Sequence, residues 1–261
     1  MNTSLQGKTA VIGGSTQGIG KAIAEELAQL GATCILLARN EQALQQVVAG
    51  LATPHQQPHS YKLADFSQPT QVQQAIDEIV AHQPVHILVN NTGGPPPGPI
   101  TEATSEALLA AFSQHIICNQ LLVQGVLPGM KEAGYGRIIN IVSTSVRIPI
   151  ANLGVSNTIR GATASWAKTL ANEVGQFGTT VNNILPGLTK TQRLTSLIEG
   201  TARRLNKSSE EVEESMLNEI PARRFGEAEE LAAVAAFLAS PAAGYVNGVS
   251  IPVDGGKTGS I

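Results

Sequence analysis

Six short runs of apolar and β-branched residues recur along the chain, separated by segments with the periodicity of amphipathic helices. Runs that are apolar nearly throughout are typical of strands buried on both faces of a parallel sheet. They are TAVI (9–12), CILLA (34–38), HILVN (86–90), RIINIV (137–142), TTVNNI (179–184) and SIPV (250–253). Strands that alternate with helices need right-handed crossovers. The pattern therefore predicts an α/β fold, a Rossmann-like, doubly wound parallel sheet with helices on both faces.

Helical periodicity fills the segments between these runs. Apolar residues form three stripes at helical spacing: Ile19, Ile23, Leu27 and Leu30; Val72, Ile76, Ile79 and Val80; and Ile159, Ala162, Trp166, Leu170 and Val174. With 261 residues, 42% of them hydrophobic, the chain is long enough for one large α/β domain. No internal repeat divides it, so we expect a single domain over residues 1–261.

The charge distribution excludes two classes of partner. The net charge is −3 and both signs are scattered, so neither nucleic acid nor an anionic membrane is an expected partner. The N-terminal segment lacks the features of a signal peptide, and no apolar run reaches the roughly 18 residues of a membrane span. Cys34 and Cys118 lie in apolar stretches, which predicts buried, reduced thiols. These features predict a cytoplasmic protein.

A glycine-rich segment joins the first predicted strand to the first predicted helix. Gly14, Gly18 and Gly20 stand in AVIGGSTQGIGKAIAEEL (10–27) with the spacing G-x-x-x-G-x-G. Glycines here allow a tight turn and let the backbone approach a pyrophosphate at the positive end of the helix. A flexible turn without a ligand is the alternative, but this position favours dinucleotide binding. The GGPPPGP segment (93–99) also follows a predicted strand directly, where ligands of such sheets bind.

Four further motifs follow the glycine segment along the chain. They are NNTG (90–93), GRIINIVS (136–143), PGLTKT (186–191) and YVNGVSIPVDGG (245–256). In this order and spacing the sequence resembles the short-chain dehydrogenase/reductase family over essentially its whole length. Within that family it is most similar to the 3-oxoacyl carrier-protein reductase branch. The resemblance is specific for fold and cofactor and much less specific for substrate.

The resemblance implies a set of cofactor-binding residues. The glycine segment would hold the adenosine end and pyrophosphate of the cofactor, and Asp65 would contact the adenine. The NNTG motif would support the central strand and the adenosine ribose, and PGLTKT would meet the nicotinamide carboxamide. The residues so implied are Gly14, Ser15, Thr16, Gln17, Gly18, Ile19, Gly20, Asp65, Phe66, Asn90, Gly93, Pro186, Gly187 and Thr191.

The residue after the second predicted strand bears on cofactor choice. An NAD-binding site of this kind has an acidic residue about 20 residues after the glycines, which binds the ribose 2′-hydroxyl. Here Ala38 stands at that position and Arg39 follows. A guanidinium pairs bidentately with a 2′-phosphate. Although an exposed arginine at a strand end needs no function, the missing acid predicts NADP(H) in preference to NAD(H).

The segment VSNTIRGA (155–162) departs from the family pattern. Members of the family that this sequence resembles reduce carbonyls with four catalytic residues: an asparagine, a serine, a tyrosine and a lysine. The serine positions the carbonyl oxygen and the tyrosine donates the proton. The lysine holds the nicotinamide ribose and lowers the tyrosine pKa, and the asparagine supports a water relay. Ser143 matches the serine, whereas Ser156 and Arg160 stand at the tyrosine and lysine positions and His115 at the asparagine position. The resemblance therefore implies an atypical catalytic set.

The replacements change the available chemistry. A phenol has a reference pKa of about 10, whereas an alkyl hydroxyl is a far weaker acid, so Ser156 cannot inherit proton donation. Arg160 stays charged because a guanidinium pKa is above about 12, so we expect it to hold ribose hydroxyls rather than pass protons. His115, whose unperturbed pKa is about 6.5, either transfers a proton at neutral pH or is a hydrogen-bonded core histidine. Both interpretations of His115 stay open.

The three tyrosines of the chain do not replace the missing phenol in this interpretation. Tyr61 lies between CILLA (34–38) and HILVN (86–90), Tyr135 in the turn before RIINIV (137–142), and Tyr245 near SIPV (250–253). None is expected to face Ser143 at a carboxyl-end loop. An acid is assigned by geometry before pKa, so we do not expect a tyrosine substitute.

Residues 192–225 form the segment that usually covers the substrate in this family. Six basic residues lie there among many glutamates: Arg193, Arg203, Arg204, Lys207, Arg223 and Arg224. A solvated helix of mixed charge explains most of this pattern, and an anionic substrate or acyl-carrier partner is the alternative. Beside the third helical stripe stand the small residues Gly161, Ala164 and Ser165. Such a face is typical of close helix packing in the family's homotetramers, although it could equally pack within one subunit.

Two functional hypotheses follow. The first is an NADP(H)-dependent oxidoreductase that acts on a small-molecule carbonyl or alcohol substrate with an atypical active site. The second is an NADP(H)-binding protein without hydride transfer, serving as a sensor or scaffold. Neither needs a metal.

Overall fold

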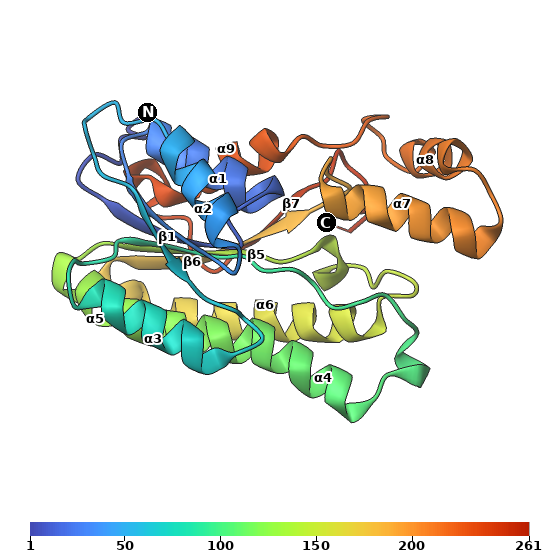
Figure 1. Ribbon diagram of the computed structural model, residues 1–261, viewed down its shortest axis with the longest axis horizontal. Helices are drawn as coiled ribbons and strands as arrows, with labels where there is room; N and C mark the ends of the chain where they lie inside the picture. Colours follow the sequence, from blue (N-terminus) through green and yellow to red (C-terminus); the bar gives the residue numbers. More distant parts are fainter. Residues whose placement is uncertain (261) are drawn as a thin grey trace.

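The computed structural model describes residues 1–260 and contains one parallel sheet of seven strands (Figure 1). Their order in space is β3-β2-β1-β4-β5-β6-β7. The strands are β1 Thr9–Gly13, β2 Thr33–Ala38, β3 Ser60–Leu63, β4 Ile87–Asn90, β5 Gly136–Ile141, β6 Thr179–Pro186 and β7 Ser250–Val253. The strand order reverses between β1 and β4, so their carboxyl ends flank the switch point where ligands of open α/β sheets bind.

Three helices cover one face of the sheet: α1 (Gly18–Gln29), α2 (Glu41–Gly50) and α9 (Ala228–Ala239) (Figure 1). Ile23 and Leu27 of α1 are fully buried in the core on this face. Removing each such side chain from water stabilises the fold by about 1.5–3 kcal/mol. The alanine-rich helix α9 packs along α1, because short side chains let the two helix backbones approach.

The opposite face is covered by α3 (Pro69–Val80), α5 (Cys118–Ala133) and α6 (Gly154–Val174). Helix α4 (Ser105–Phe112) runs into α5 through a π-helical segment, Ser113–Ile117. Short 3₁₀ segments occupy Ile100–Glu102, Thr144–Val146, Gly175–Phe177 and Pro241–Ala243.

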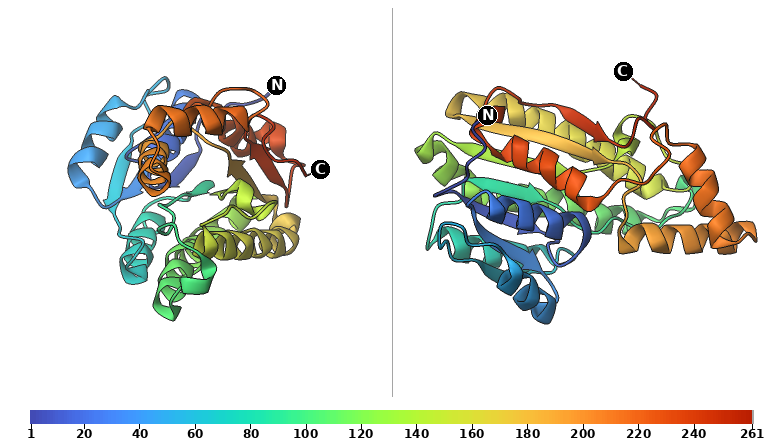
Figure 2. Two further views of the ribbon diagram at one scale, coloured as in Figure 1. Left: turned by 90° about the vertical axis from the view of Figure 1, so that its right-hand side faces the viewer. Right: turned by 90° about the horizontal axis from the view of Figure 1, so that it is seen from above.

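Helices α7 (Gln192–Leu205) and α8 (Ser209–Asn218) project beyond the sheet at the end where the strands have their carboxyl ends (Figure 2). They have a small apolar cluster of their own: Leu194, Ile198, Ala202, Val212, Ile220 and Phe225. Helix α8 begins with a capping box in which Ser208 and Glu211 satisfy each other's backbone N–H groups. This pair of helices therefore forms a partly independent lobe above the switch-point end.

The doubly wound sheet and its six predicted strands are confirmed. The three helical stripes lie on α1, α3 and α6, except that Leu30 directly follows the end of α1. Both cysteines are buried and unpaired, as expected. Among residues 1–260, no helix combines the length and the apolar character needed to cross a bilayer.

Candidate active site

The glycine segment forms a tight turn between β1 and α1. Gly14 and Gly18 have φ angles of 56° and 54°, a left-handed region that disfavours side chains. A Cβ on Gly20 would lie 2.3 Å from the carbonyl oxygen of Gly14. Gly14, Gly18 and Gly20 are thus required by the backbone itself, and the turn leads directly into the N-terminus of α1.

The end of β4 holds this turn in place. The Asn91 side-chain amide donates hydrogen bonds to the carbonyl oxygens of Gly13 (3.1 Å) and Gly14 (3.2 Å). Ser15 is fully buried, and its hydroxyl has no partner among residues 1–260. Thr16 and Ile19 are half-buried and Gln17 is exposed. Asn91 is not among the cofactor-binding residues predicted from the sequence, which include Asn90. Its position directly after the strand next to β1 indicates that its amide can reach the turn.

Asn90 instead begins a ladder of buried amides across four strands. Its Nδ2 donates to Asn140 Oδ1 (2.8 Å), Asn140 Nδ2 donates to Asn183 Oδ1 (2.9 Å), and Asn183 Nδ2 donates to Ser250 Oγ (3.0 Å). These residues are register partners in β4, β5, β6 and β7. The ladder ties β4, β5, β6 and β7 together through side chains as well as through the backbone.

Arg39 and Asp65 lie together at the carboxyl ends of β2 and β3. Arg39 Nη1 is 3.9 Å from Asp65 Oδ2, and the Arg39 side chain is 76% exposed. Such an exposed pair contributes little stability, so Arg39 is free to move to another anion. The pKa of Asp65 is lowered, first because its carboxylate accepts the backbone N–H of Ser67. Phe66 is buried against Gly13, which leaves only its backbone for a cofactor.

The segment after β6 closes over the glycine turn. Thr191 Cγ2 lies 3.1 Å from the position that a Cβ on Gly18 would take. Gly187 approaches Asp254 so closely that a Cβ there would be 2.6 Å from the Asp254 Cα atom. Pro186, the last residue of β6, and Gly187 thus direct the chain toward Thr191 and the start of α7.

The β5–α6 region brings three predicted catalytic residues to one end of the sheet. Ser143 follows β5, and its hydroxyl accepts the backbone N–H of Ser145 at 3.1 Å. Ser156 and Arg160 are buried in the first two turns of α6. The Ser156 hydroxyl forms no hydrogen bond within the described part of the chain, whereas Arg160 Nη1 donates to the Ile141 carbonyl oxygen at 3.0 Å. Burial lowers the pKa of Arg160 to about 10, so it remains charged at neutral pH.

His115 lies in the π-helical segment between α4 and α5 and is 2% exposed. Segments of this kind are frequent at functional sites. Burial, followed by the charges of Arg160 and Arg193, lowers the pKa of His115 to about 3. Its Nε2 has no hydrogen-bond partner among the described residues. At neutral pH the ring is therefore neutral, and it is not a ready source of a proton.

The proline-rich loop after β4 is held on both sides. Gly98 exchanges backbone hydrogen bonds with Asn152 and Gly154 at the start of α6. At its other end, Arg193 of α7 lies against Gly94, with Nη1 3.4 Å from the Gly94 carbonyl oxygen. The Gln114 side chain donates to Thr92 Oγ1 and to the Gly93 carbonyl oxygen, both at 3.1 Å. The loop therefore connects His115, α6 and α7.

The tyrosines lie away from this end of the sheet. The Tyr135 hydroxyl donates to the Ala239 carbonyl oxygen at the amino end of β5. The Tyr61 hydroxyl, on the edge strand β3, donates to the Glu41 carboxylate at the start of α2. Tyr245 precedes β7 and is fully exposed. No phenol lies beside Ser143 or Ser156.

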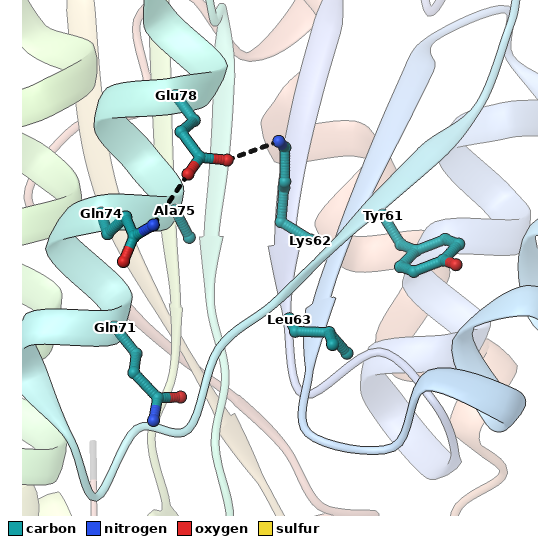
Figure 3. A pocket seen from close by; sticks show the side chains of 7 residues that line it. All are labelled: Tyr61, Lys62, Leu63, Gln71, Gln74, Ala75 and Glu78. Atoms are coloured by element: carbon teal, nitrogen blue, oxygen red, sulfur yellow. Dashed lines mark hydrogen bonds and ion pairs between the residues drawn. The ribbon is translucent and has the colours of Figure 1, made fainter.

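A surface pocket of about 430 Å³ lies elsewhere, between β3 and α3 (Figure 3). It is lined by Tyr61, Lys62, Leu63, Gln71, Gln74, Ala75 and Glu78. Lys62 and Glu78 form an ion pair at 2.6 Å across it. Neither of its elements contributes a predicted catalytic residue. Within residues 1–260, no group of three or more His, Cys, Asp or Glu side chains is placed to hold a metal ion.

A parallel sheet with a glycine turn at its switch point defines the Rossmann-like class of fold. A family model described as enoyl-(acyl carrier protein) reductase matches residues 14–258. The chain belongs to the short-chain dehydrogenase/reductase family.

Similar proteins span nearly the whole chain. The 3-oxoacyl-[acyl-carrier-protein] reductase FabG of Pseudomonas aeruginosa is 35% identical, over 97% of this chain and 98% of its own. The NADPH-dependent reductase BacG of Bacillus subtilis is 31% identical, over 97% of this chain and 99% of its own. Among solved structures, L-sorbose reductase from Gluconobacter frateurii, complexed with NADPH and L-sorbose, is 32% identical with a TM-score of 0.92 and full coverage of both chains.

Proposed function

We propose that the chain is an NADP(H)-dependent oxidoreductase that interconverts a small-molecule carbonyl compound and its alcohol, with an atypical proton-transfer site. The glycine turn carries this proposal. The left-handed turn at Gly14 and Gly18 and the unpartnered hydroxyl of Ser15 both fit a pyrophosphate at the start of α1. Support also comes from BacG, named an NADPH-dependent reductase, and from the sorbose reductase complex with NADPH.

The cofactor-binding residues follow from the same proposal. Residues 14–20 hold the pyrophosphate, and Asn91 fixes that turn. Arg39 pairs with the 2′-phosphate, which favours NADP(H) over NAD(H), and Asp65 and the Phe66 backbone lie toward the adenine. The remaining contacts are with Gly93 at the adenosine ribose, Pro186, Gly187 and Thr191 at the carboxamide, and Arg160 at the nicotinamide ribose. When bound, the cofactor supplies or accepts the hydride.

Four residues surround the reacting carbonyl in this proposal. Ser143 and Ser156 donate or accept hydrogen bonds at the substrate oxygen, and Arg160 stabilises negative charge that develops there. Ser156 and Arg160 take the positions that the family gives to tyrosine and lysine. With the pKa of His115 about 3 and that of Arg160 about 10, neither is poised to donate a proton at neutral pH. The proton for reduction therefore comes from water or from the substrate.

The rival function is a nucleotide-binding sensor or scaffold without hydride transfer. Transfer of deuterium from 4-deuterated NADPH to a panel of small ketones and 3-oxoacyl thioesters distinguishes the two. We expect slow but measurable deuterium in the alcohol product by mass spectrometry. NADPH binding with no deuterium in any product would establish the rival instead.

Two further expectations belong to this proposal. Residues 192–225, which include α7 and α8, cover the substrate. Gly161, Ala164 and Ser165 on α6 form a face open to a second copy, since no atom lies within 4 Å of the Cβ position of Gly161. We propose a homotetramer, and light scattering that shows a monomer at micromolar concentration would reject it.

A further inference from the structure

Three nitrogen-rich side chains come from elements that meet at the carboxyl ends of β4 and β5: His115 from the π-helical segment, Arg160 from α6 and Arg193 from α7. Arg193 comes from the first turn of α7 and lies against Gly94, where a Cβ would be 2.9 Å from its Nη2. The carbonyl oxygen of the neighbouring residue, Gly93, accepts the side-chain amide of Gln114, the residue before His115, at 3.1 Å. Arg160 comes from α6, which packs against the π-helical segment that holds His115.

These side chains lack acidic partners. Arg160 is buried and donates to a single carbonyl oxygen, that of Ile141, although a guanidinium has five N–H donors. Nε2 of His115 is buried without a partner. Within residues 1–260, no carboxylate lies within 4 Å of the Arg160 or Arg193 guanidinium. A buried charge ordinarily has a counter-charge, so this arrangement is incomplete without a ligand.

The groups also act on one another electrostatically. After burial, the charges of Arg160 and Arg193 are the largest causes that lower the pKa of His115, and Arg193 likewise lowers the pKa of Arg160. No acidic residue contributes to either shift. Placing an anion among the three groups would turn this mutual repulsion into attraction.

We propose that the substrate carries a carboxylate near its reacting carbonyl, as a 2-oxo or 3-oxo acid does, and that Arg193 is the residue that selects it. This inference rests on the proposed function and narrows its substrate class. Arg193 is exposed, whereas Arg160 and His115 are buried, so it can meet a carboxylate that arrives from solvent. Its planar fork matches a carboxylate bidentately. Arg160 then adds charge at the inner end of the site.

The cofactor pyrophosphate is another source of negative charge. It is expected at residues 14–20, and Thr191, two residues before Arg193, lies against Gly18. Arg193 itself extends the other way, to Gly94 after β4. An arginine that served the pyrophosphate would control cofactor affinity, whereas one that serves the substrate controls the preference for an acid over its ester.

The test compares acids with their neutral methyl esters by calorimetry on the NADP⁺-saturated protein. The pairs are acetoacetate and methyl acetoacetate, and benzoylformate and methyl benzoylformate. Wild type is compared with Arg193→Gln and with Arg203→Gln, a matched control because Arg203 is exposed on the same helix. NADPH affinity of each variant is measured separately, which also tests the proposed function on its own.

We expect at least one acid to bind about tenfold more tightly than its ester in wild type and in Arg203→Gln. Arg193→Gln is expected to lose that preference for the acid. Its NADPH affinity is expected to stay within about threefold of the wild-type value, whereas loss of a cofactor contact would cost about tenfold, or 1.4 kcal/mol. NMR titrations follow the His115 signal, which is assigned by its absence in His115→Asn. The pKa of His115 is expected to rise in Arg193→Gln. In wild type it is expected to rise when an acid binds and to stay unchanged when an ester binds. Equal binding of acid and ester in wild type would overturn the inference. So would an Arg193→Gln variant whose main loss is NADPH affinity.

Discussion

The two sides of the candidate site are built by different means. Around the β1–α1 turn, backbone geometry specifies the structure: Gly14 and Gly18 occupy left-handed conformations, and Gly20 leaves no room for a side chain. Around β5, α6 and α7, the character of the site depends on side chains instead: Ser156, Arg160 and His115 are buried there, and Arg160 carries a charge. The first side tolerates almost no substitution, because a turn of this kind is satisfied only by glycine. The second can change its chemistry while the fold stays the same.

The energetics of the two sides differ in the same way. The turn is tied by neutral hydrogen bonds from Asn91 to Gly13 and Gly14, each contributing about 0.5–1.5 kcal/mol. At the other side, Arg160 is buried with one hydrogen-bond acceptor, and Nε2 of His115 is buried without a partner among residues 1–260, which costs stability unless a ligand compensates. The comparison predicts that substitutions at the turn strongly weaken cofactor binding, whereas a substitution at Ser156 changes the chemistry and leaves cofactor binding largely intact.

The largest effect is expected from restoring the family's proton donor. Ser156→Tyr combined with Arg160→Lys should raise NADPH oxidation with 3-oxoacyl thioesters or small ketones by about 10²- to 10⁴-fold, the usual contribution of a general acid. Steady-state rates measure the gain, with both single variants as controls and NADPH affinity as the check on folding. A double variant that binds NADPH but shows no gain would mean that the scaffold lacks more than a proton donor.

The next largest effect concerns the glycine turn. In Gly20→Ala the new Cβ would lie 2.3 Å from the Gly14 carbonyl oxygen and 2.6 Å from Asn91 Nδ2, so the turn must shift. Overpacking costs about 1–3 kcal/mol, which corresponds to about a 5- to 150-fold loss of NADPH affinity by fluorescence titration. Gly50→Ala is the control, because no atom lies within 4 Å of its Cβ position. If both variants bind NADPH like wild type, the turn does not hold the cofactor.

A smaller effect is expected at Arg39. Arg39→Ala should weaken NADPH binding by about tenfold, or 1.4 kcal/mol, because a guanidinium–phosphate contact is lost. NADH affinity should stay the same, since NADH lacks the 2′-phosphate, and it serves as the internal control. Equal wild-type affinities for the two cofactors would show that Arg39 plays no part in the choice.

The last expected effect is on the free energy of unfolding as a function of pH, and it does not involve the cofactor. Unfolded His115 binds a proton below about pH 6.5, whereas folded His115, with a pKa of about 3, does not until the solution is far more acidic. The unfolded state therefore binds more protons between these values, and the folded state loses stability as the pH falls. The free energy of unfolding, measured with urea at several pH values, should depend on pH less steeply in His115→Asn than in wild type, by up to about 1.4 kcal/mol per pH unit. An unchanged slope would mean that the ring is not held neutral.

How much the sequence reveals also differs between the two sides. The glycine spacing predicted the turn, because the backbone requirement is local, and the apolar runs predicted six strands. The strand at the sheet edge, Ser60–Leu63, is absent from those runs, since its residues are partly exposed and carry no apolar pattern. The pKa of His115 depends on burial between α4, α5 and α6, and the contact of Arg193 with Gly94 joins residues 99 positions apart. Neither follows from local sequence.

One measurement tests the contrast between the two sides most directly: a crystal structure of the protein with NADP⁺ bound. We predict the pyrophosphate on the turn from Gly14 to Gly20 and the 2′-phosphate within hydrogen-bonding distance of Arg39. Around C4 of the nicotinamide we predict Ser143, Ser156 and Arg160, with no phenol or carboxylic acid of the chain in reach of a substrate oxygen. A cofactor seated away from the glycine turn, or a tyrosine hydroxyl beside C4, would contradict the account.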